Sequence, residues 1–544
     1  MIIKLLRLFH TVKYLKVKQV VWRAINLLPN FVRQIEIHPP ISKVTNSNQY
    51  ILREGFTENF KIFTFLNESF NLEEVGWDNP TISKLWRYNL HYFEFLLQDN
   101  ITIKQRDLQY KTIENWIDNN QFGIGTGWEP YPTSLRIINW IKWHWSTGNL
   151  SDRAKISLWN QVRLLESRPE YHLLGNHLFI NAKALIFATV FFNQNANSSI
   201  YKKALKIIKQ ELDEQFLPDG AHFELSPMYH SLAMEDLLDL VSISEYLPND
   251  FPKMKVVRKY EKGMVWLKTM IYFNEELAHF NDCANGIAPV FSQLERYAKK
   301  LGLLKLDLKS NSFNYHSDSG FVVYQDKKSH FIGDIGKIGP DYLPGHSHAD
   351  TFSLELAIKG NRIIVNSGTS VYGDSKERLR QRGTSAHSTL QIDAEDSSEV
   401  WSGFRVARRA KPFDVKVDFE KEKRELAIYA SHDGYLRLRN SPIHKRIFNF
   451  ENDIWQIRDI ISESGHQVVS RYFLHPDIHI KMNESDLILS KNGQDIVRFI
   501  YNSHCEIEIF DSTYHDKFGS CRSNKCIDVR TISPCDFSIK LEIL

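Results

Sequence analysis

The chain has 544 residues, more than one hydrophobic core usually supports, so the sequence predicts two or three domains. Its formal charge of +3 is nearly neutral for this length, which excludes a dedicated nucleic-acid-binding protein. No stretch is the long uncharged apolar run that spans a membrane. The 12 Trp and 22 Tyr would suit a cleft in which sugar rings stack on aromatic faces, but a large aromatic core also explains them.

Residues 1–74 open with a basic amphipathic segment and form a lead-in to the rest of the chain. Seven Lys or Arg residues precede the first acidic residue, Glu36, and are interleaved with apolar side chains. The segment lacks the continuous apolar region and the cleavage site of a secretory signal, so we expect an unexported protein, cytoplasmic or peripheral to the inner membrane face. Contact of residues 1–30 with anionic lipid is one expectation, and packing against the body is the alternative. The five cysteines are then expected to be free thiols.

Residues 75–310 are predicted to form a helical domain. Apolar residues recur at helical spacing in four clear segments, residues 135–143, 177–192, 199–216 and 232–246. Turn residues such as Pro218-Asp219-Gly220 separate the segments. Consecutive helices joined by short loops pack as antiparallel hairpins, and an array of such hairpins would close into an incomplete (α/α) toroid.

Residues 311–544 are predicted to form an antiparallel β-sandwich, with the domain boundary near residue 310. β-Branched and aromatic residues occur here in short runs between turn residues, for example Phe321-Val322-Val323-Tyr324. Lys359-Gly360-Asn361 is predicted to be a tight hairpin turn. No dinucleotide-type glycine fingerprint or P-loop interrupts the pattern, so we expect an all-β body of stacked antiparallel sheets.

Four short motifs hold the polar residues of a candidate site. They are Gly175-Asn176-His177, the run from Asp219 to His230, Gly345-His346-Ser347-His348-Ala349-Asp350, and Arg382-Gly383-Thr384-Ser385-Ala386-His387. Histidines two residues apart on an extended strand point to the same side, so His346 and His348 are expected in one wall of the site. In this order and at these separations the motifs resemble the heparinase II/III family, over about residues 75–420.

The resemblance implies both a fold and an activity. The implied fold is a multi-domain α+β architecture, the helical toroid followed by the β-sandwich that alginate-lyase-like enzymes share. The implied activity is that of a polysaccharide lyase, which cleaves a uronic-acid-containing anionic polysaccharide by β-elimination. Members without export signals are often linked to capsule or exopolysaccharide gene clusters, which implies a substrate from that pool.

Elimination from a uronate needs a group that neutralises the carboxylate, a base for the adjacent proton and an acid for the leaving oxygen. By resemblance, Asn176 neutralises the carboxylate, His177 assists proton abstraction, Tyr229 is the catalytic tyrosine and His346 closes the cleft from the β domain. An asparagine amide suits the first role because it donates to a carboxylate without adding a competing acid. The structural alternatives are a helix N-cap for Asn176 and ordinary packing at helix starts for His177 and Tyr229.

A structural zinc ion is a further implication of the resemblance. His348 and His387 match positions that bind zinc in some members. The third ligand in those members is an aspartate, where this chain has Asn366, a poor zinc ligand compared with a carboxylate. Asp350 is expected as a substitute.

A second set of residues is predicted to bind substrate. Trp86, Arg87, Tyr88 and Asn89 resemble the family's cleft entrance, and Trp128 lies in a rigid aromatic loop. Glu224 and Arg382 complete the prediction, with Arg378 and Arg380 as further candidates for binding uronate or sulfate. The alternative for the aromatic residues is packing between helices, and for the arginines a solvated face.

Two other functions stay open from the sequence. One is a glycoside hydrolase on the same toroid, with Glu224 and either Asp219 or Asp282 as an acid/base pair. The other is a noncatalytic polysaccharide-binding or assembly protein, which the missing aspartate at Asn366 and the basic N-terminus favour slightly.

Overall fold

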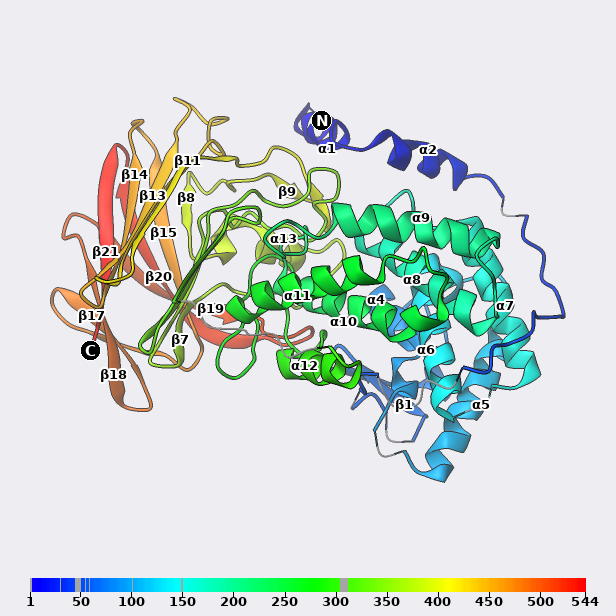
Figure 1. Cartoon of the computed structure of the whole chain (residues 1–544). Helices are drawn as coiled ribbons and strands as arrows, with labels where there is room; N and C mark the ends of the chain where they lie inside the picture. Colours follow the sequence, from blue (N-terminus) through cyan, green and yellow to red (C-terminus); the bar gives the residue numbers. More distant parts are fainter. Residues whose placement is uncertain are drawn as a thin grey trace.

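The structure is a computed structural model that describes residues 2–29, 31–44, 50–53, 55–57, 59–99, 101–147, 150–303 and 312–544. A helical half and a β half lie side by side (Figure 1). This arrangement confirms the predicted incomplete toroid followed by stacked antiparallel sheets. The predicted boundary near residue 310 lies outside the described residues. Among the helices of the described chain, none combines the length and apolar character needed to cross a membrane.

The helical half follows the predicted pattern of hairpins. Its α-helices are α1 Ile2–Val12, α2 Val17–Ile25, α3 Leu72–Val75, α4 Lys84–Tyr92, α5 Ile103–Asn119, α6 Pro130–Thr147, α7 Asp152–Ser167, α8 Gly175–Phe191, α9 Ser199–Glu214, α10 Pro227–Ile243, α11 Lys253–Thr269 and α12 Phe291–Lys300. A hairpin of β1 (Ile62–Phe65) and β2 (Glu68–Asn71) precedes α4. Ser151, Ser198 and Ser226 start α7, α9 and α10 by accepting a hydrogen bond from the N–H three residues on.

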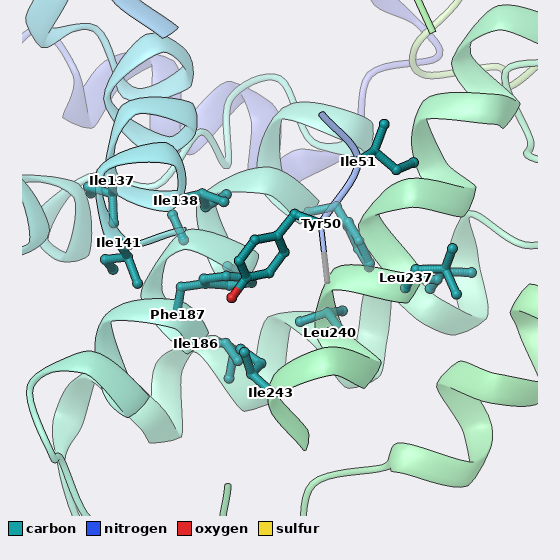
Figure 2. Packing of buried hydrophobic residues seen from close by; sticks show 14 of the residues in the cluster. Tyr50, Ile51, Ile137, Ile138, Ile141, Ile186, Phe187, Leu237, Leu240 and Ile243 are labelled. Atoms are coloured by element: carbon teal, nitrogen blue, oxygen red, sulfur yellow. The ribbon is translucent and has the colours of Figure 1, made fainter. Parts of the chain in front are cut away.

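Helix α8 is the central helix of this half. Every residue from Leu178 to Phe191 is buried, so the helix is covered on all sides rather than along one stripe. Figure 2 shows Phe187 of α8 among side chains of α6 and α10, with Tyr50 from the lead-in pointing into the same cluster. The first residues of α8 are therefore held in place by packing along its whole length.

The β half contains two large antiparallel sheets. The first has the order β11 (Pro412–Glu420), β12 (Glu425–His432), β13 (His444–Glu451), β14 (Ile454–Ile461), β21 (Cys535–Ile543), β18 (Gln494–Tyr501), β17 (Asp486–Lys491) and β16 (His479–Met482). The second has the order β19 (Glu506–Tyr514), β20 (Arg522–Ile532), β15 (Gln467–Leu474), β7 (Asn361–Val365), β6 (Leu354–Ile358), β5 (Ser329–Asp334), β4 (Phe321–Gln325) and β3 (Phe313–His316), with β8 (Leu390–Ile392) also on β15.

Two local features of this half bear on the predictions. The tight turn predicted at Lys359-Gly360-Asn361 is present between β6 and β7, with Lys359 and Gly360 as its two loop residues at φ of 50° and 77° and Asn361 as the first residue of β7. These paired positive values are typical of the type I′ turn that suits a twisted hairpin. The expectation of an all-β half was wrong in one place, because helix α13 (Lys376–Arg382) lies between β7 and β8. The short pair β9 (Val400–Trp401) and β10 (Arg405–Val406) follows it.

The second sheet is a middle layer with two buried faces. Val322 and Tyr324 of β4 belong to the core between the two sheets. Phe321 and Val323 point the other way and pack in a cluster that includes Trp266 of α11. Strand β4 is therefore a continuous apolar run instead of an alternating one. This shared cluster fixes the β half against the toroid and so fixes the geometry of any site between them.

Candidate active site

A cavity of about 1250 Å³ lies between the two halves. Asn176, His177 and Tyr229 line it from the helices, and His346 lines it from the β half. The structure thus brings together all four residues that the sequence predicts to be catalytic. Their roles remain predictions, and the contacts of each side chain indicate what each could do.

Asn176 is placed by a sharp bend at the start of α8. Leu174 and Gly175 both have positive φ, 69° and 56°. A Cβ atom on Gly175 would lie 2.3 Å from Leu343 Cδ2, so a larger residue would need both a strained backbone and a shift of the Leu343 side chain. The N-cap position is Leu174, whose own side chain makes no capping hydrogen bond. Asn176 is inside the helix, so its amide is free of the capping role.

His177, the next residue, is oriented by a buried carboxylate. Its Nδ1 lies 3.1 Å from Oε1 of Glu170, and Glu170 Oε2 accepts a hydrogen bond from Asn181. Burial alone would lower the pKa of His177, but the charge of Glu170 and its hydrogen bond outweigh burial and raise the pKa. The imidazole therefore holds a proton more readily than a free histidine, beside Asn176 in the cavity wall.

Tyr229 lies in the first turn of α10. The Ser226 hydroxyl accepts from the Tyr229 N–H and donates to the Asp282 carbonyl oxygen, which anchors this turn to the other wall. The phenol oxygen of Tyr229 is 2.9 Å from that of Tyr372, and its ring centroid is 4.1 Å from that of His346. Burial, followed by Tyr372 and Asp282, raises the pKa of Tyr229 well above its ordinary value. The phenol keeps its proton, which suits an acid.

Asp282 is the centre of the opposite wall. Its carboxylate accepts from His346 Nδ1 at 2.9 Å, from His348 Nε2 at 2.8 Å and from both terminal nitrogens of Arg378. Burial would raise its pKa, but Arg378 and the two imidazoles hold the pKa well below the usual range. An ionised carboxylate only accepts, so the proton of His346 sits on Nδ1. In the neutral imidazole the lone pair is then on Nε2, and the side chain is 18% exposed in the cavity.

The two histidines for which the sequence predicts zinc lie next to this wall. His348 Nδ1 and His387 Nε2 are 3.2 Å apart, close to the separation of about 3.3 Å that two nitrogen ligands of a tetrahedral zinc would have. Asp282 on the other nitrogen of His348 resembles the carboxylate that commonly orients a metal-bound histidine. Within the described ranges, however, no three His, Cys, Asp or Glu side chains are grouped to hold a metal, and Asp350 does not join the pair. Asn366 has a buried amide nitrogen without a partner there.

The predicted substrate-binding residues divide into two groups. Tyr88, Asn89 and Glu224 line the cavity. Trp86 and Trp128 are core residues instead, because Trp86 packs between Phe65 and Phe70 and Trp128 packs on Trp116 and Phe122.

The predicted arginines are engaged in internal contacts. Arg87 binds Asp78 and Thr126. Arg382 is buried and donates to the Ser347 carbonyl oxygen, and Arg378 is buried against Asp282. The guanidinium groups of Arg87, Arg378 and Arg382 hold loops together, so they are not available to bind an anionic sugar as the sequence predicts. Arg380 is partly exposed and pairs with Glu377.

Three residues of this site, Glu170, Asp282 and Tyr372, have roles that the sequence does not indicate. Glu170 and Tyr372 lie in irregular segments without a recognisable motif, and Asp282 was considered only as an acid of a hydrolase. Glu170 is seven residues from His177, and Asp282 is 64 residues from His346. No short sequence pattern indicates that a carboxylate at such a separation orients the histidine. The Ser226-Pro227 helix start was the one sequence signal that correctly positioned its neighbour, Tyr229.

A helical toroid facing stacked antiparallel sheets, with a cavity between them, defines the fold class of the toroid-and-sandwich polysaccharide lyases. The family model "Heparinase II/III N-terminus" matches residues 155–301, and "Heparinase II/III-like, C-terminal" matches residues 309–534. The chain belongs to the heparinase II/III family.

The similar proteins are consistent with this assignment. A heparin-sulfate lyase of Bacteroides stercoris is 23% identical over 257 residues, which cover 43% of this chain and 38% of the relative. A heparin-sulfate lyase of Pedobacter heparinus is 26% identical over 248 residues, 40% of this chain and 36% of the relative. These matches span little more than a third of either relative. A crystal structure of heparinase III superposes with a TM-score of 0.67 at 16% identity, covering 97% of this chain and 89% of the other, which shows a shared fold.

Proposed function

We propose that this protein is a polysaccharide lyase that cleaves a uronic-acid-containing anionic polysaccharide by β-elimination. The observation that carries the proposal is the pairing of two histidines with buried carboxylates on opposite walls of one cavity, His177 with Glu170 and His346 with Asp282. Tyr229 lies beside His346, within ring contact. A neutraliser, a base and an acid are thus available around one volume.

Each of these side chains has a role that follows from its contacts. The Asn176 amide and the positively charged form of His177 would bind the uronate carboxylate and stabilise the charge that develops on it. His346 Nε2, which carries the lone pair, would remove the proton next to the carboxylate. The Tyr229 phenol, whose raised pKa keeps it protonated, would then donate to the leaving sugar oxygen. Water is not consumed in this sequence.

The position of the base next to the acid also favours one class of uronate. The rings of Tyr229 and His346 are in contact, so both would approach the same face of the sugar. In glucuronate the C5 proton and the C4 oxygen lie on the same face, whereas in iduronate they lie on opposite faces. We therefore propose glucuronate-type residues as the preferred cleavage sites.

A hydrolase is the weaker alternative for this cavity. Burial raises the pKa of Glu224, as a catalytic acid would need. A hydrolase also needs a second carboxylate, and neither predicted residue is available for that role. The Asp282 carboxylate is fully occupied by hydrogen bonds from Arg378, His346 and His348. Asp219 accepts from Ser319 and caps a turn outside the cavity lining.

The substrate pool and the cellular site belong to the same proposal. The two curated relatives carry the name heparin-sulfate lyase, and we propose a glycosaminoglycan-like polymer, from a capsule or exopolysaccharide pool, as substrate. We propose a location at the inner face of a membrane. A panel of uronate polymers, followed by the ultraviolet absorbance of unsaturated products, tests the activity. We expect product from a glucuronate-containing polymer with wild type and none with His346→Ala. A noncatalytic polysaccharide-binding protein would bind the panel without any product.

We also propose that His348 and His387 hold one zinc ion weakly, with Asn366 or water as the third contact. Such an ion would be structural, linking the segment that carries His346 to the one that carries His387. Asn366→Asp should tighten zinc binding by at least about tenfold because it supplies a charged oxygen ligand. Metal analysis of both purified proteins measures this. Zinc in neither protein would leave the two histidines as a hydrogen-bonded pair.

A further inference from the structure

The N-terminal arm, residues 4–29, lies along the outside of the molecule and connects the two halves (Figure 1). Helix α1 is held to the β half, where Thr11 accepts a hydrogen bond from Trp401 Nε1 at 3.1 Å. Helix α2 is held to the cavity region, where Gln19 donates to the carbonyl oxygens of Leu173 and Tyr342. Polar side chains thus attach both helices, and the Trp22 ring of α2 also packs on Tyr171 at a centroid distance of 4.7 Å.

Several apolar side chains of the arm are exposed to solvent. In α1, Leu5, Leu8, Phe9 and Val12 are 58%, 44%, 64% and 47% exposed. Their spacing of three and four residues places them on one face of the helix. Leu8 and Val12 also line the edge of the cavity, whereas Leu5 and Phe9 do not line it and are the more exposed pair.

Helix α2 repeats this exposure. Val17, Val20 and Val21 are 78%, 52% and 48% exposed, and Leu28, which follows the helix, is 61% exposed. Both helices thus present apolar faces to solvent. An apolar surface of this extent marks an interaction site.

The charge of the arm points to the kind of partner. Residues 4–33 include seven Lys or Arg residues, and no acidic residue occurs before Glu36. Lys4, Lys13 and Arg23 are exposed, and in the described part of the chain no carboxylate pairs with them. A second copy of the chain would bring the same positive surface against itself. An anionic lipid surface complements both the apolar faces and the charge.

We propose that the N-terminal arm docks the protein on an anionic lipid bilayer, with the two apolar faces at the acyl boundary and the basic side chains among the headgroups. The arm also forms part of the cavity rim, through Leu15 and Arg23. Docking would hold the opening of the cavity beside the lipid surface, where a membrane-associated polymer would enter it. The proposal does not depend on the reaction catalysed in the cavity.

Vesicle flotation of the full chain tests this proposal. Wild type should float with phosphatidylcholine vesicles that contain phosphatidylglycerol, and at least about tenfold less with phosphatidylcholine alone. Phe9→Ser combined with Val20→Ser should lower binding to the anionic vesicles about tenfold, because it removes one apolar side chain from the exposed face of each helix. Neither residue lines the cavity, so the cavity should be unaffected. Phe273→Ser, which removes a 99% exposed aromatic ring elsewhere, is the matched control and should bind as wild type does.

A charge variant separates lipid docking from other uses of the apolar faces. Lys4→Glu combined with Lys13→Glu should also lower binding to anionic vesicles about tenfold or more, with an unchanged melting temperature. Absence of wild-type binding to anionic vesicles would overturn the proposal. Sedimentation that shows a dimer broken by the Phe9 and Val20 substitutions, without vesicle binding, would overturn it in favour of a second copy as the partner.

Discussion

At the residue scale, Tyr229 is the most informative position of the site. Tyr229→Phe should lower kcat by about 10²–10⁴-fold and leave KM nearly unchanged, because the ring stays while the proton donor is lost. Tyr372→Phe removes only the hydroxyl that contacts the Tyr229 phenol and should have a smaller effect. Tyr315→Phe, on a partly exposed strand residue, serves as a control in the same steady-state assay. Wild-type turnover by Tyr229→Phe would remove this residue from the mechanism.

The Glu170–His177 pair predicts a pH dependence of stability. The raised pKa of His177 contributes stability that is present below its unfolded value of 6.5 and is lost as pH rises through the folded pKa. The lowered pKa of Glu170, where burial is outweighed by His177, contributes stability that is present above 4.5 and is lost as pH falls. Glu170→Gln should therefore lower the free energy of unfolding most, by about 1–2 kcal/mol, between pH 4.5 and pH 6.5.

Thermal unfolding across pH measures this difference. Glu166→Gln, on α7, is the control because its carboxylate makes no comparable pair within the described residues. A stability difference between wild type and Glu170→Gln that stays constant from acid to alkaline pH would contradict the assigned ion pair.

At the element scale, the start of α8 predicts a specific sensitivity. Gly175→Ala adds a Cβ at a positive φ and 2.3 Å from Leu343 Cδ2, so it should destabilise the protein by about 1–3 kcal/mol. It should also reduce activity, because Asn176 and His177 follow directly.

Gly360→Ala gives the matched comparison. Gly360 also has a positive φ, but a Cβ there would contact nothing within 4 Å. Gly360→Ala should lower the free energy of unfolding by about 1 kcal/mol, through backbone strain alone, and leave activity unchanged. Equal losses of activity in the two variants would show that the bend before α8 does not position the site.

The elements were largely predictable because their signals are local. Helical periodicity, the Ser226-Pro227 helix start and the Lys359-Gly360 turn each lie within a few residues. Helix α13 was missed because its seven residues are mostly charged and two of its arginines are buried by distant partners. Charged side chains that are buried as ion pairs look like surface residues in a sequence.

At the scale of the whole molecule, the site exists only between the two halves. The sequence motifs predicted the four residues Asn176, His177, Tyr229 and His346, and the structure places all four at one cavity. The partners that orient them could not be predicted, since Asp282 reaches His346 and Arg378 through contacts 64 and 96 residues apart. Trp86 and Trp128 showed the opposite error, because an aromatic side chain that could stack on a sugar is equally suited to packing in the core, where both residues lie.

The most direct test of the account is the mass of the products formed in water enriched in heavy oxygen. β-Elimination adds no water, so the products of a glucuronate-containing polymer should carry no heavy oxygen, and their masses should sum to that of the substrate. One product should end in an unsaturated uronate. Products that contain one heavy oxygen for each bond cleaved would show hydrolysis and contradict the assignment of His346 as the base and Tyr229 as the acid of an elimination.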